Sequence, residues 1–180
     1  MRVRSSILIA AAAAITVSSA PLAAQSLTTG EGPLRSQGAL TIGPVASINF
    51  PTGDTGDFFE TGFTLGVQGT YGLGAIALLG EVTYNSLGGK TVDGVEGYDG
   101  DANGFAIDAG VRTGLPIGQK LGLYVGGVTG FWFGDFDDDF DIVPLVGIQL
   151  GPVDIEGRYK GLIGDADWFS VGGAVHFRLK

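Results

Sequence analysis

The residues of this chain that could do chemistry are few, and most are carboxylates gathered in four segments. Hard divalent cations prefer several carboxylate oxygens as ligands, so weak binding of Mg²⁺ or Ca²⁺ is one interpretation of these segments. A solvated, charged loop surface without a ligand is the other. Lys90 alone opposes the fourteen carboxylates, which are Asp54, Asp57 and Glu60; Asp93, Glu96, Asp99 and Asp101; Asp135, Asp137, Asp138, Asp139 and Asp141; and Asp165 and Asp167.

One acidic segment matches half of a calcium-binding loop. The run Asp99-Gly-Asp101-Ala-Asn103-Gly104 follows the first six positions, D-x-D-x-[DN]-G, of the twelve-residue motif. The twelfth position should carry a bidentate Glu, but it is Gly110 and it falls within an expected strand. Because the motif is incomplete, the sequence assigns no metal-binding residue.

His176 is the only histidine, so acid–base or nucleophilic catalysis would depend on it. Such catalysis needs a nucleophile and a base within hydrogen-bond reach of each other. No Ser stands two residues from His176, and no carboxylate neighbours it along its own strand. We therefore expect His176 to form hydrogen bonds inside the fold, and we assign no catalytic or cofactor-binding residue.

Two glycine motifs and one tryptophan are further candidates. Gly72-Leu-Gly74 and Gly126-Gly127 precede no expected helix and carry no Lys, which excludes phosphate-binding loops. Trp132 lies between two phenylalanines and could stack on a sugar or a lipid. Anchoring at a membrane interface is the interpretation we prefer for this tryptophan.

These residues must be positioned by eight strand-like runs, at 39–50, 63–72, 75–84, 104–114, 121–133, 142–150, 153–160 and 169–179. The connections alternate in length. The long ones are 51–62, 85–103, 134–141 and 161–168, and the short ones are 73–74, 115–120 and 151–152. An even number of antiparallel strands with all long loops at one end is typical of a bacterial outer-membrane barrel.

Alternation within the runs gives each expected strand an apolar and a polar face. Because an unpaired buried charge costs several kcal/mol, a balance of charges on the polar faces fits an ion-paired interior with the apolar faces outward. Tyr124, Trp132 and Gln149 share the inward faces, and bulges are expected at Pro44 and Pro144, which remove ladder donors. The charges on the polar faces are Glu81, Asp108, Asp154 and Glu156 against Arg112, Arg158, Lys160 and Arg178.

Aromatic residues are sorted by depth along the expected strands. Rings collect at membrane interfaces because they combine an apolar body with a polar or polarisable edge. Tyr71 and Phe177 fall at the ends with short turns. A soluble sheet with its apolar face inward has no reason for this sorting, which therefore favours a membrane barrel. At the ends with long loops lie Phe50, Phe63, Tyr84, Phe105, Phe131, Phe133, Tyr159 and Phe169.

The first 24 residues predict export from the cytoplasm. Arg2 and Arg4 precede an apolar stretch from Ile7 to Val17, and Ala24 offers a small residue for cleavage, as in a secretory signal peptide. We expect three segments: a cleavable signal peptide at 1–24, a periplasmic segment at 25–37 and a barrel domain at 38–180. Removal of the two arginines would take the formal charge from −9 to −11, which argues against nucleic acid as a partner.

Two features of the composition bound the fold further. Cysteine is absent, so no disulfide framework supports it. Glycine supplies 33 of 180 residues without a three-residue period, which excludes collagen and suits the bends of a small barrel.

In these respects the chain resembles the small OmpA/OmpX-like group of outer-membrane barrels. The resemblance covers about residues 38–180 and includes the closing strand Val171-Gly-Gly-Ala-Val-His-Phe-Arg-Leu. In that group the last strand is the signal read by the outer-membrane assembly machinery and usually ends on Phe, whereas here Phe177 is followed by Arg178, Leu179 and Lys180. The resemblance implies an all-β fold, an eight-stranded antiparallel transmembrane β-barrel in the bacterial outer membrane.

The expected function is that of a small non-enzymatic barrel with acidic extracellular loops, serving envelope structure or surface interaction. Eight strands leave an interior that side chains can fill, so we expect no wide pore. The expected partners are outer-membrane lipid, the assembly machinery and, in one interpretation, divalent cations at the loops, with the protein a monomer. Two alternatives stay open: an outer-membrane enzyme acting on lipid A, and a secreted soluble β-domain that binds a ligand.

Overall fold

The computed structural model describes residues 37–90, 100–117, 121–135, 140–162 and 167–179. No helix in these residues is long and apolar enough to cross a membrane. The expected signal peptide and most of the segment after it lie outside the described residues. The elements are β1 Leu40–Pro51, α2 Gly53–Phe58, β2 Gly62–Gly72, β3 Ile76–Leu87, β4 Ala102–Pro116, β5 Leu121–Gly134, β6 Phe140–Leu150, β7 Val153–Lys160, β8 Trp168–Val175 and β9 Phe177–Arg178.

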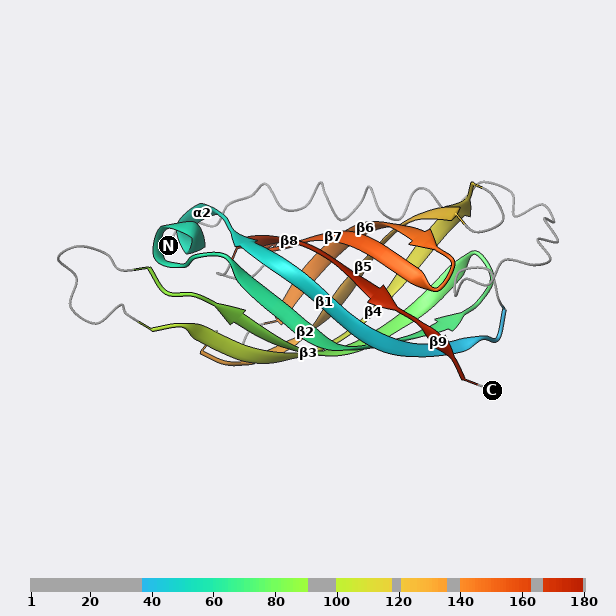
Figure 1. Cartoon of the computed structure of the whole chain (residues 1–180), viewed down its shortest axis with the longest axis horizontal. Coiled ribbons are helices and arrows are strands. Elements are labelled where there is room, and N and C mark those ends of the chain that lie inside the picture. Colours follow the sequence, from blue (N-terminus) through green and yellow to red (C-terminus); the bar gives the residue numbers. More distant parts are fainter. Residues whose placement is uncertain (1–36, 91–99, 118–120, 136–139, 163–166, 180) are drawn as a thin grey trace.

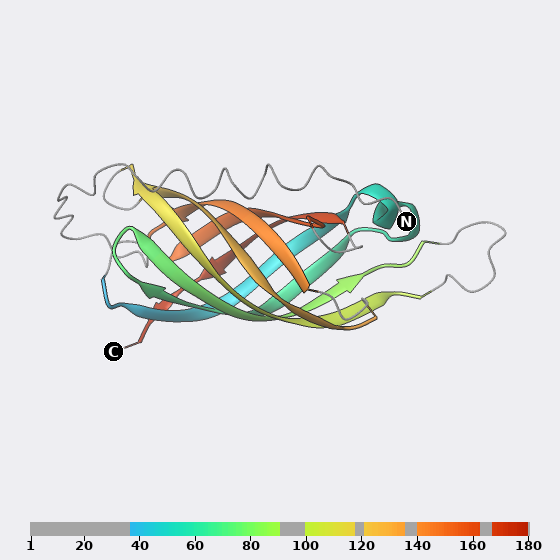
Figure 2. The same cartoon turned by 180° about the vertical axis from the view of Figure 1, so that it is seen from behind.

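The strands form one closed antiparallel barrel (Figures 1 and 2). From β2 to β8, each strand pairs with the next along the chain, and β1 closes the sheet by pairing with β2 on one side and with β8 and β9 on the other. β8 and β9 are two parts of the final strand, because they share one register against β1 and only His176 separates them. The predicted eight-stranded barrel is therefore confirmed.

The two ends of the barrel differ, as the sequence predicts. The end that holds Leu40, Arg178 and the short connections at 73–75 and 151–152 is called the turn end (Figure 1). Gly74 and Gly151 have φ angles of 93° and 61° in these two connections, a region of backbone space that favours glycine. The opposite end, called the loop end, holds α2 and the strand ends that flank the long connections.

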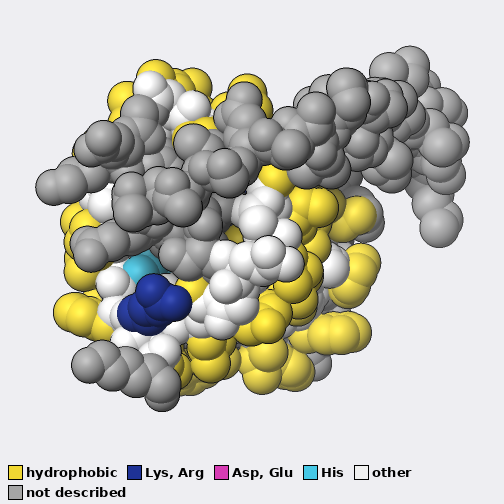
Figure 3. Space-filling model, turned by 90° about the vertical axis from the view of Figure 1, so that its right-hand side faces the viewer, with side chains coloured by type: hydrophobic (Ala, Val, Ile, Leu, Met, Phe, Trp, Pro, Cys, Tyr) yellow, Lys and Arg dark blue, Asp and Glu magenta, His cyan; other side chains and the backbone are white. Residues whose placement is uncertain are grey.

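The barrel is apolar outside and largely polar inside. Along β6 every second residue is buried, and the exposed positions are Phe140, Ile142, Pro144, Val146, Ile148 and Leu150. Figure 3 looks onto the turn end, where hydrophobic side chains surround a polar mouth. This orientation matches the predicted membrane arrangement and contradicts the alternative of a soluble domain with its apolar face inward. In water these apolar side chains would stay exposed to solvent, whereas in a membrane the lipid tails cover them.

Outward-facing aromatic rings gather near the loop end. Tyr84 lies between Phe63 and Phe105, with ring centroids 6.2 and 5.3 Å away. The Tyr84 hydroxyl donates a hydrogen bond to Oδ1 of Asn103 at 2.8 Å. Phe177 is 61% exposed near the turn end. The predicted sorting of aromatics by depth is confirmed.

Some strands extend further toward the loop end than the sequence analysis expected. β3 continues to Leu87 rather than ending at 84, β4 begins at Ala102, and β6 begins at Phe140. Leu87 is fully buried and Ala102 is 5% exposed, so inward packing continues beyond the residues with clear alternation. The long connections are correspondingly shorter than expected.

The expected bulges at Pro44 and Pro144 are not formed. The β1–β2 ladder runs through Pro44, and β1 keeps the same register against β8 and β9 on either side of it. The β6–β7 ladder begins at Leu145, directly after Pro144. Because proline has no N–H to donate, the neighbouring ladder is interrupted or ended at these positions without the insertion of an extra residue.

Candidate functional site

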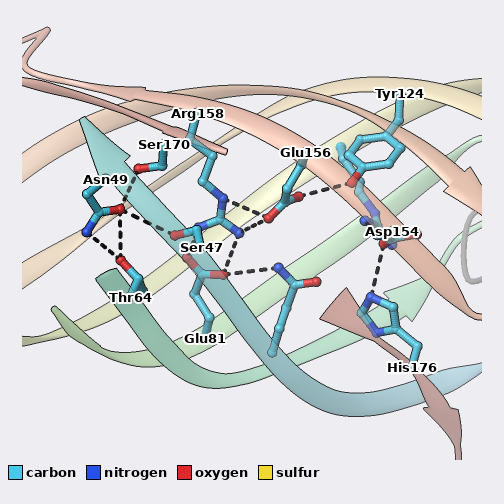
Figure 4. Close-up of polar contacts among 12 residues, drawn as sticks. Ser47, Asn49, Thr64, Glu81, Tyr124, Asp154, Glu156, Arg158, Ser170 and His176 are labelled. Carbon is cyan, nitrogen blue, oxygen red and sulfur yellow. Dashed lines mark hydrogen bonds and ion pairs between the residues drawn. The ribbon is translucent and has the colours of Figure 1, made fainter. Parts of the chain in front are cut away.

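The centre of the barrel interior is occupied by an ion-paired network (Figure 4). Arg158 of β7 pairs through Nη1 and Nη2 with both carboxylate oxygens of Glu81, which lies 77 residues earlier. Its Nε and Nη2 also donate to Oε1 of Glu156 at 2.8 and 2.5 Å. Gln68 donates to Glu81 at 3.1 Å, and the Tyr124 hydroxyl donates to Glu156 at 3.0 Å. Arg158 thus shares its single positive charge between two carboxylates and joins opposite walls of the barrel.

A second cluster lies nearer the turn end. Nη1 of Arg112 pairs with Oδ2 of Asp154 at 2.5 Å, and both side chains are fully buried. The same oxygen lies 3.0 Å from Nε2 of His176, and the Arg112 guanidinium lies 4.6 Å from the centroid of the Tyr124 ring. The prediction that His176 forms hydrogen bonds in the interior is confirmed.

The His176 cluster also contains a hydroxyl, which sequence reasoning missed. Oγ1 of Thr41 lies 3.4 Å from Nδ1 of His176 and 2.6 Å from Oγ1 of Thr70. Hydroxyl, imidazole and carboxylate therefore follow one another as in a nucleophile–base–acid series. Asp154 pairs with Ala174 in the β7–β8 ladder and so lies diagonally beside His176. Only the register of these two strands could have revealed this carboxylate as a neighbour of the histidine. All three members of the series are nearly or fully buried, and Asp154 is already paired with Arg112.

The loop end of the interior holds both tryptophans. Trp132 and Trp168 meet edge to face with centroids 5.2 Å apart, and their exposed fractions are 5% and 2%. The ammonium of Lys160 lies 3.1 Å from the centroid of the Trp132 ring and 4.4 Å from that of the Trp168 ring. This is a cation–π arrangement. The preferred interpretation of Trp132 as an interface anchor is wrong, because its position in β5 points the ring inward.

A row of neutral polar side chains links four strands on one side of the interior. Asn49 of β1 bonds Thr64 of β2 and accepts from Ser170 of β8, while Thr64 donates to Asn85 of β3 at 2.6 Å. These residues are 0–9% exposed, and the row lies beside the ion-paired network in Figure 4. Polar groups in this part of the barrel satisfy one another, as buried groups in proteins generally do.

A cavity of about 40 Å³ remains between the network and the tryptophans. Since a cavity needs about 10–15 Å³ to hold one water, this one has room for only a few waters or a small ion. It is lined by residues of both polar groups and by small and apolar side chains: Val45, Ser47, Thr64, Glu81, Thr83, Asn85, Asp108, Val128, Trp132, Val143, Glu156, Arg158, Lys160, Trp168, Ser170, Gly172 and Gly173.

One of the eight predicted interior charges lies elsewhere. Arg178 is exposed in β9 at the turn end, and Figure 3 shows one patch of Lys and Arg atoms at this end, next to the histidine. The other seven are buried or, for Arg158, half-buried. The sequence pattern gave the correct face for Arg178, but the strand ends before that face is enclosed.

The acidic segments are only partly described, and one carboxylate there is not a loop residue. Asp141 is 1% exposed at the start of β6, where its oxygens accept from the backbone N–H of Ile142 and of Gly161. Asp54, Asp57, Glu60, Asp101 and Asp135 are exposed, and Asp167 is half-buried. The remaining acidic loop residues lie outside the described part: Asp93, Glu96, Asp99, Asp137, Asp138, Asp139 and Asp165.

The second half of the calcium-loop match is strand rather than loop. Asn103 and Gly104 pair with Ser86 and Asn85 in the β3–β4 ladder. Oδ1 of Asn103 accepts from Tyr84, and Oδ1 of Asp101 accepts from the backbone N–H of Gly89 at 3.1 Å. An extended backbone cannot wrap its oxygens around one ion, so the motif does not form a calcium loop.

The glycine motifs have structural explanations. Gly74 makes the β2–β3 turn with its positive φ. A Cβ on Gly126 would collide with the backbone of Val111 and with Arg112, and a Cβ on Gly147 would collide with the Tyr124 ring. Glycine therefore makes room for the Tyr124 ring over the neighbouring strand β6 and for the close approach of β4 to β5 at Arg112.

Comparisons with protein-family profiles and with curated protein sequences find no match. Solved structures do match. Neisserial surface protein A has a TM-score of 0.58 at 12% identity, covering 79% of this chain and 100% of that one. The Yersinia pestis outer-membrane protein Ail in a nanodisc has 0.50 at 17%, covering 78% and 100%. OprG of Pseudomonas aeruginosa has 0.50 at 13%, covering 83% and 100%.

At these identities the likeness concerns the fold. It is the fold of small eight-stranded outer-membrane barrels, as the sequence resemblance implies. The apolar exterior of the barrel independently requires a lipid surround. Bacterial outer-membrane placement follows from the fold and the exterior together.

Proposed function

We propose that this outer-membrane barrel is a non-enzymatic protein that serves envelope structure or contact with external partners. The observation that carries the proposal is the filled interior. Arg158 bridges opposite walls, and the cavity beside it has a volume of about 40 Å³. An interior packed in this way supports a structural or surface role rather than transport through a wide pore.

The test of the closed interior is a conductance measurement on purified protein in planar bilayers. We expect no stable, large conductance steps, with a sixteen-stranded porin as the positive control because its barrel encloses an aqueous channel. Long-lived large steps from preparations free of porin would contradict the proposal.

The proposal includes an orientation and a set of partners. The turn end would face the periplasm, and the acidic loop end would face outward on a rigid scaffold, as loops that carry function commonly do. Outer-membrane lipid would cover the exterior of a monomer, and the last strand would be recognised by the assembly machinery. Protease added to intact cells is expected to cut the loop-end connections and to spare the turns at 73–75 and 151–152.

Divalent cations at the loop end are a further part of the proposal. Asp101 and Asp135 are both exposed, and Asp135, directly after β5, accepts a hydrogen bond from the backbone N–H of Asn103 in β4 at 3.0 Å. The two carboxylates therefore lie at neighbouring strand ends on the rim of the barrel. Mutual repulsion of loop carboxylates is only partly screened at physiological salt. Protease cleavage of the loops with and without millimolar Ca²⁺ tests this part. Identical cleavage rates in Ca²⁺ and in EDTA would leave a solvated charge cluster.

An enzyme acting on lipid A is the second candidate, because Thr41, His176 and Asp154 form a hydroxyl–imidazole–carboxylate series. Burial of this series near the turn end weighs against access for a lipid substrate in the outer leaflet. Mass spectrometry of lipid A after incubation with the purified protein decides between the two. Changed acylation that is abolished by His176→Ala would establish the enzyme and overturn the proposal.

A further inference from the structure

Asp108 lines the interior cavity beside Glu81 and Glu156 but takes no part in the ion pairs that Arg158 makes with these two carboxylates. Asp108 of β4 is 6% exposed and stands directly opposite Glu81 of β3 in the ladder. Like charges at directly opposite positions destabilise a sheet. Glu81 is ion-paired with Arg158, whereas no donor among the described residues reaches Oδ1 of Asp108. A buried carboxylate oxygen in this state needs a partner from outside the protein.

Asp108 also lines the 40 Å³ cavity, where the charges do not balance. Three carboxylates line it, those of Glu81, Asp108 and Glu156, against two cationic groups, those of Arg158 and Lys160. Arg158 is shared between Glu81 and Glu156, and the Lys160 ammonium is held against the Trp132 ring. The cavity is therefore one positive charge short, and of its three carboxylates Asp108 is the one that neither of the Arg158 ion pairs includes.

The cavity wall beside Asp108 is rich in oxygen. Thr83 and Asn85 of β3 and Thr64 of β2 line the same space, and hydroxyl and amide oxygens are ligands that hard cations accept. The volume has room for one small ion with one or two waters and not for an organic cation. The described residues contain no group of three or more His, Cys, Asp or Glu placed so that it could hold a metal ion, and a deficit of one charge is balanced by a monovalent ion.

We propose that this cavity binds one small monovalent cation, of the size of Na⁺ or K⁺, against Oδ1 of Asp108. The cation supplies the missing charge and separates Asp108 from Glu81. Binding of this kind stabilises the folded barrel by mass action, because the unfolded chain has no such site. The inference is independent of the proposed surface role.

The experiment is urea unfolding of the barrel refolded into phosphatidylcholine vesicles, since urea adds no cation. Unfolding is measured in chloride salts of Na⁺, K⁺ and tetraethylammonium at equal ionic strength. For cation at tenfold excess over its Kd, the wild-type midpoint should rise by about 0.5–1.4 M relative to tetraethylammonium. Asp108→Asn should abolish the difference, because a neutral amide leaves no charge to balance.

Asp57→Asn is the matched control, since it removes the same charge from an exposed position on α2 and should keep the wild-type response. Three results would overturn the proposal. One is equal midpoints in all three salts, and another is an equal cation response in Asp108→Asn. The third is a midpoint that ignores the cation but depends on pH only when Asp108 is present, which would make the partner a proton.

A second measurement needs no variant. Crystals of the wild-type protein in 100 mM rubidium chloride, with Rb⁺ standing in for K⁺, should give an anomalous peak in the cavity beside Asp108. Crystals that diffract well enough to show Rb⁺ elsewhere but not in the cavity would contradict the proposal, even if Asp108→Asn failed to fold.

Discussion

Arg158 is the residue on which the charge balance of the interior depends most. It is the common partner of Glu81 and Glu156, which come from strands that are not neighbours in the sheet. Removing one member of a buried ionic group leaves the other charges uncompensated. The free energy of unfolding then typically falls by about 3–5 kcal/mol. The importance of Arg158 therefore lies in the two carboxylates that surround it.

Arg158→Met is accordingly expected to lower the free energy of unfolding by about 3–5 kcal/mol. The measurement is urea unfolding in vesicles, followed by loss of the β-sheet circular dichroism signal. The triple variant Arg158→Met, Glu81→Gln, Glu156→Gln should recover much of the loss, because it removes the charges left unpaired. If the single and triple variants were equally unstable, packing of Arg158 rather than its charge would be responsible.

The β2–β3 turn is an element whose shape rests on one backbone conformation. A Cβ on Gly74 would have open space around it, but the φ angle of this residue is 93°. Gly80, within β3, also has open space for a Cβ and lacks a positive φ. The two glycines thus separate backbone conformation from steric crowding.

Gly74→Ala should destabilise the barrel by about 1–2 kcal/mol, the cost of a left-handed conformation for an L-residue. Gly80→Ala should be close to neutral. Urea midpoints of the two variants, prepared in parallel, check this prediction. Equal midpoints would mean that the turn relaxes to accept the alanine.

The loop-end segments of β5 and β8 place both tryptophans inside the barrel, where lipid cannot reach them. Lipids brominated near the headgroup quench tryptophans anchored at a membrane interface. Because Trp132 and Trp168 are 5% and 2% exposed and face the interior, we expect weak quenching by such lipids in the folded barrel. Strong quenching in Trp168→Phe, where Trp132 alone fluoresces, would restore the interface interpretation.

The whole molecule is a sheet without an edge, and this closure should govern its resistance to detergent. β1 pairs along its length with β2 on one side and with β8 and β9 on the other. A closed ladder leaves no edge strand from which unfolding can begin. Unheated protein in sodium dodecyl sulfate should therefore migrate differently from boiled protein. Identical migration before and after boiling would count against the closed barrel.

Much of the fold could be predicted from the sequence because the side-chain period of a strand is local. Alternation gave the inward positions of Tyr124 and Gln149 and the outward position of Phe105. Turn glycines such as Gly74 marked where the chain reverses. Where alternation was diluted by small and polar residues, as between 84 and 87, the strand ended later than expected.

The sequence by itself determined the strands, their two faces and the sorting of long and short connections, since each depends on neighbouring residues. The tertiary structure alone decided which interior groups meet. Arg158 reaches Glu81 across 77 residues, Asp154 is shared by Arg112 and His176, and Asp108 is left without a protein donor at Oδ1 in the described residues. Contacts across a barrel depend on strand tilt, stagger and closure, which are properties of the whole sheet and leave no mark in the pattern of any one strand.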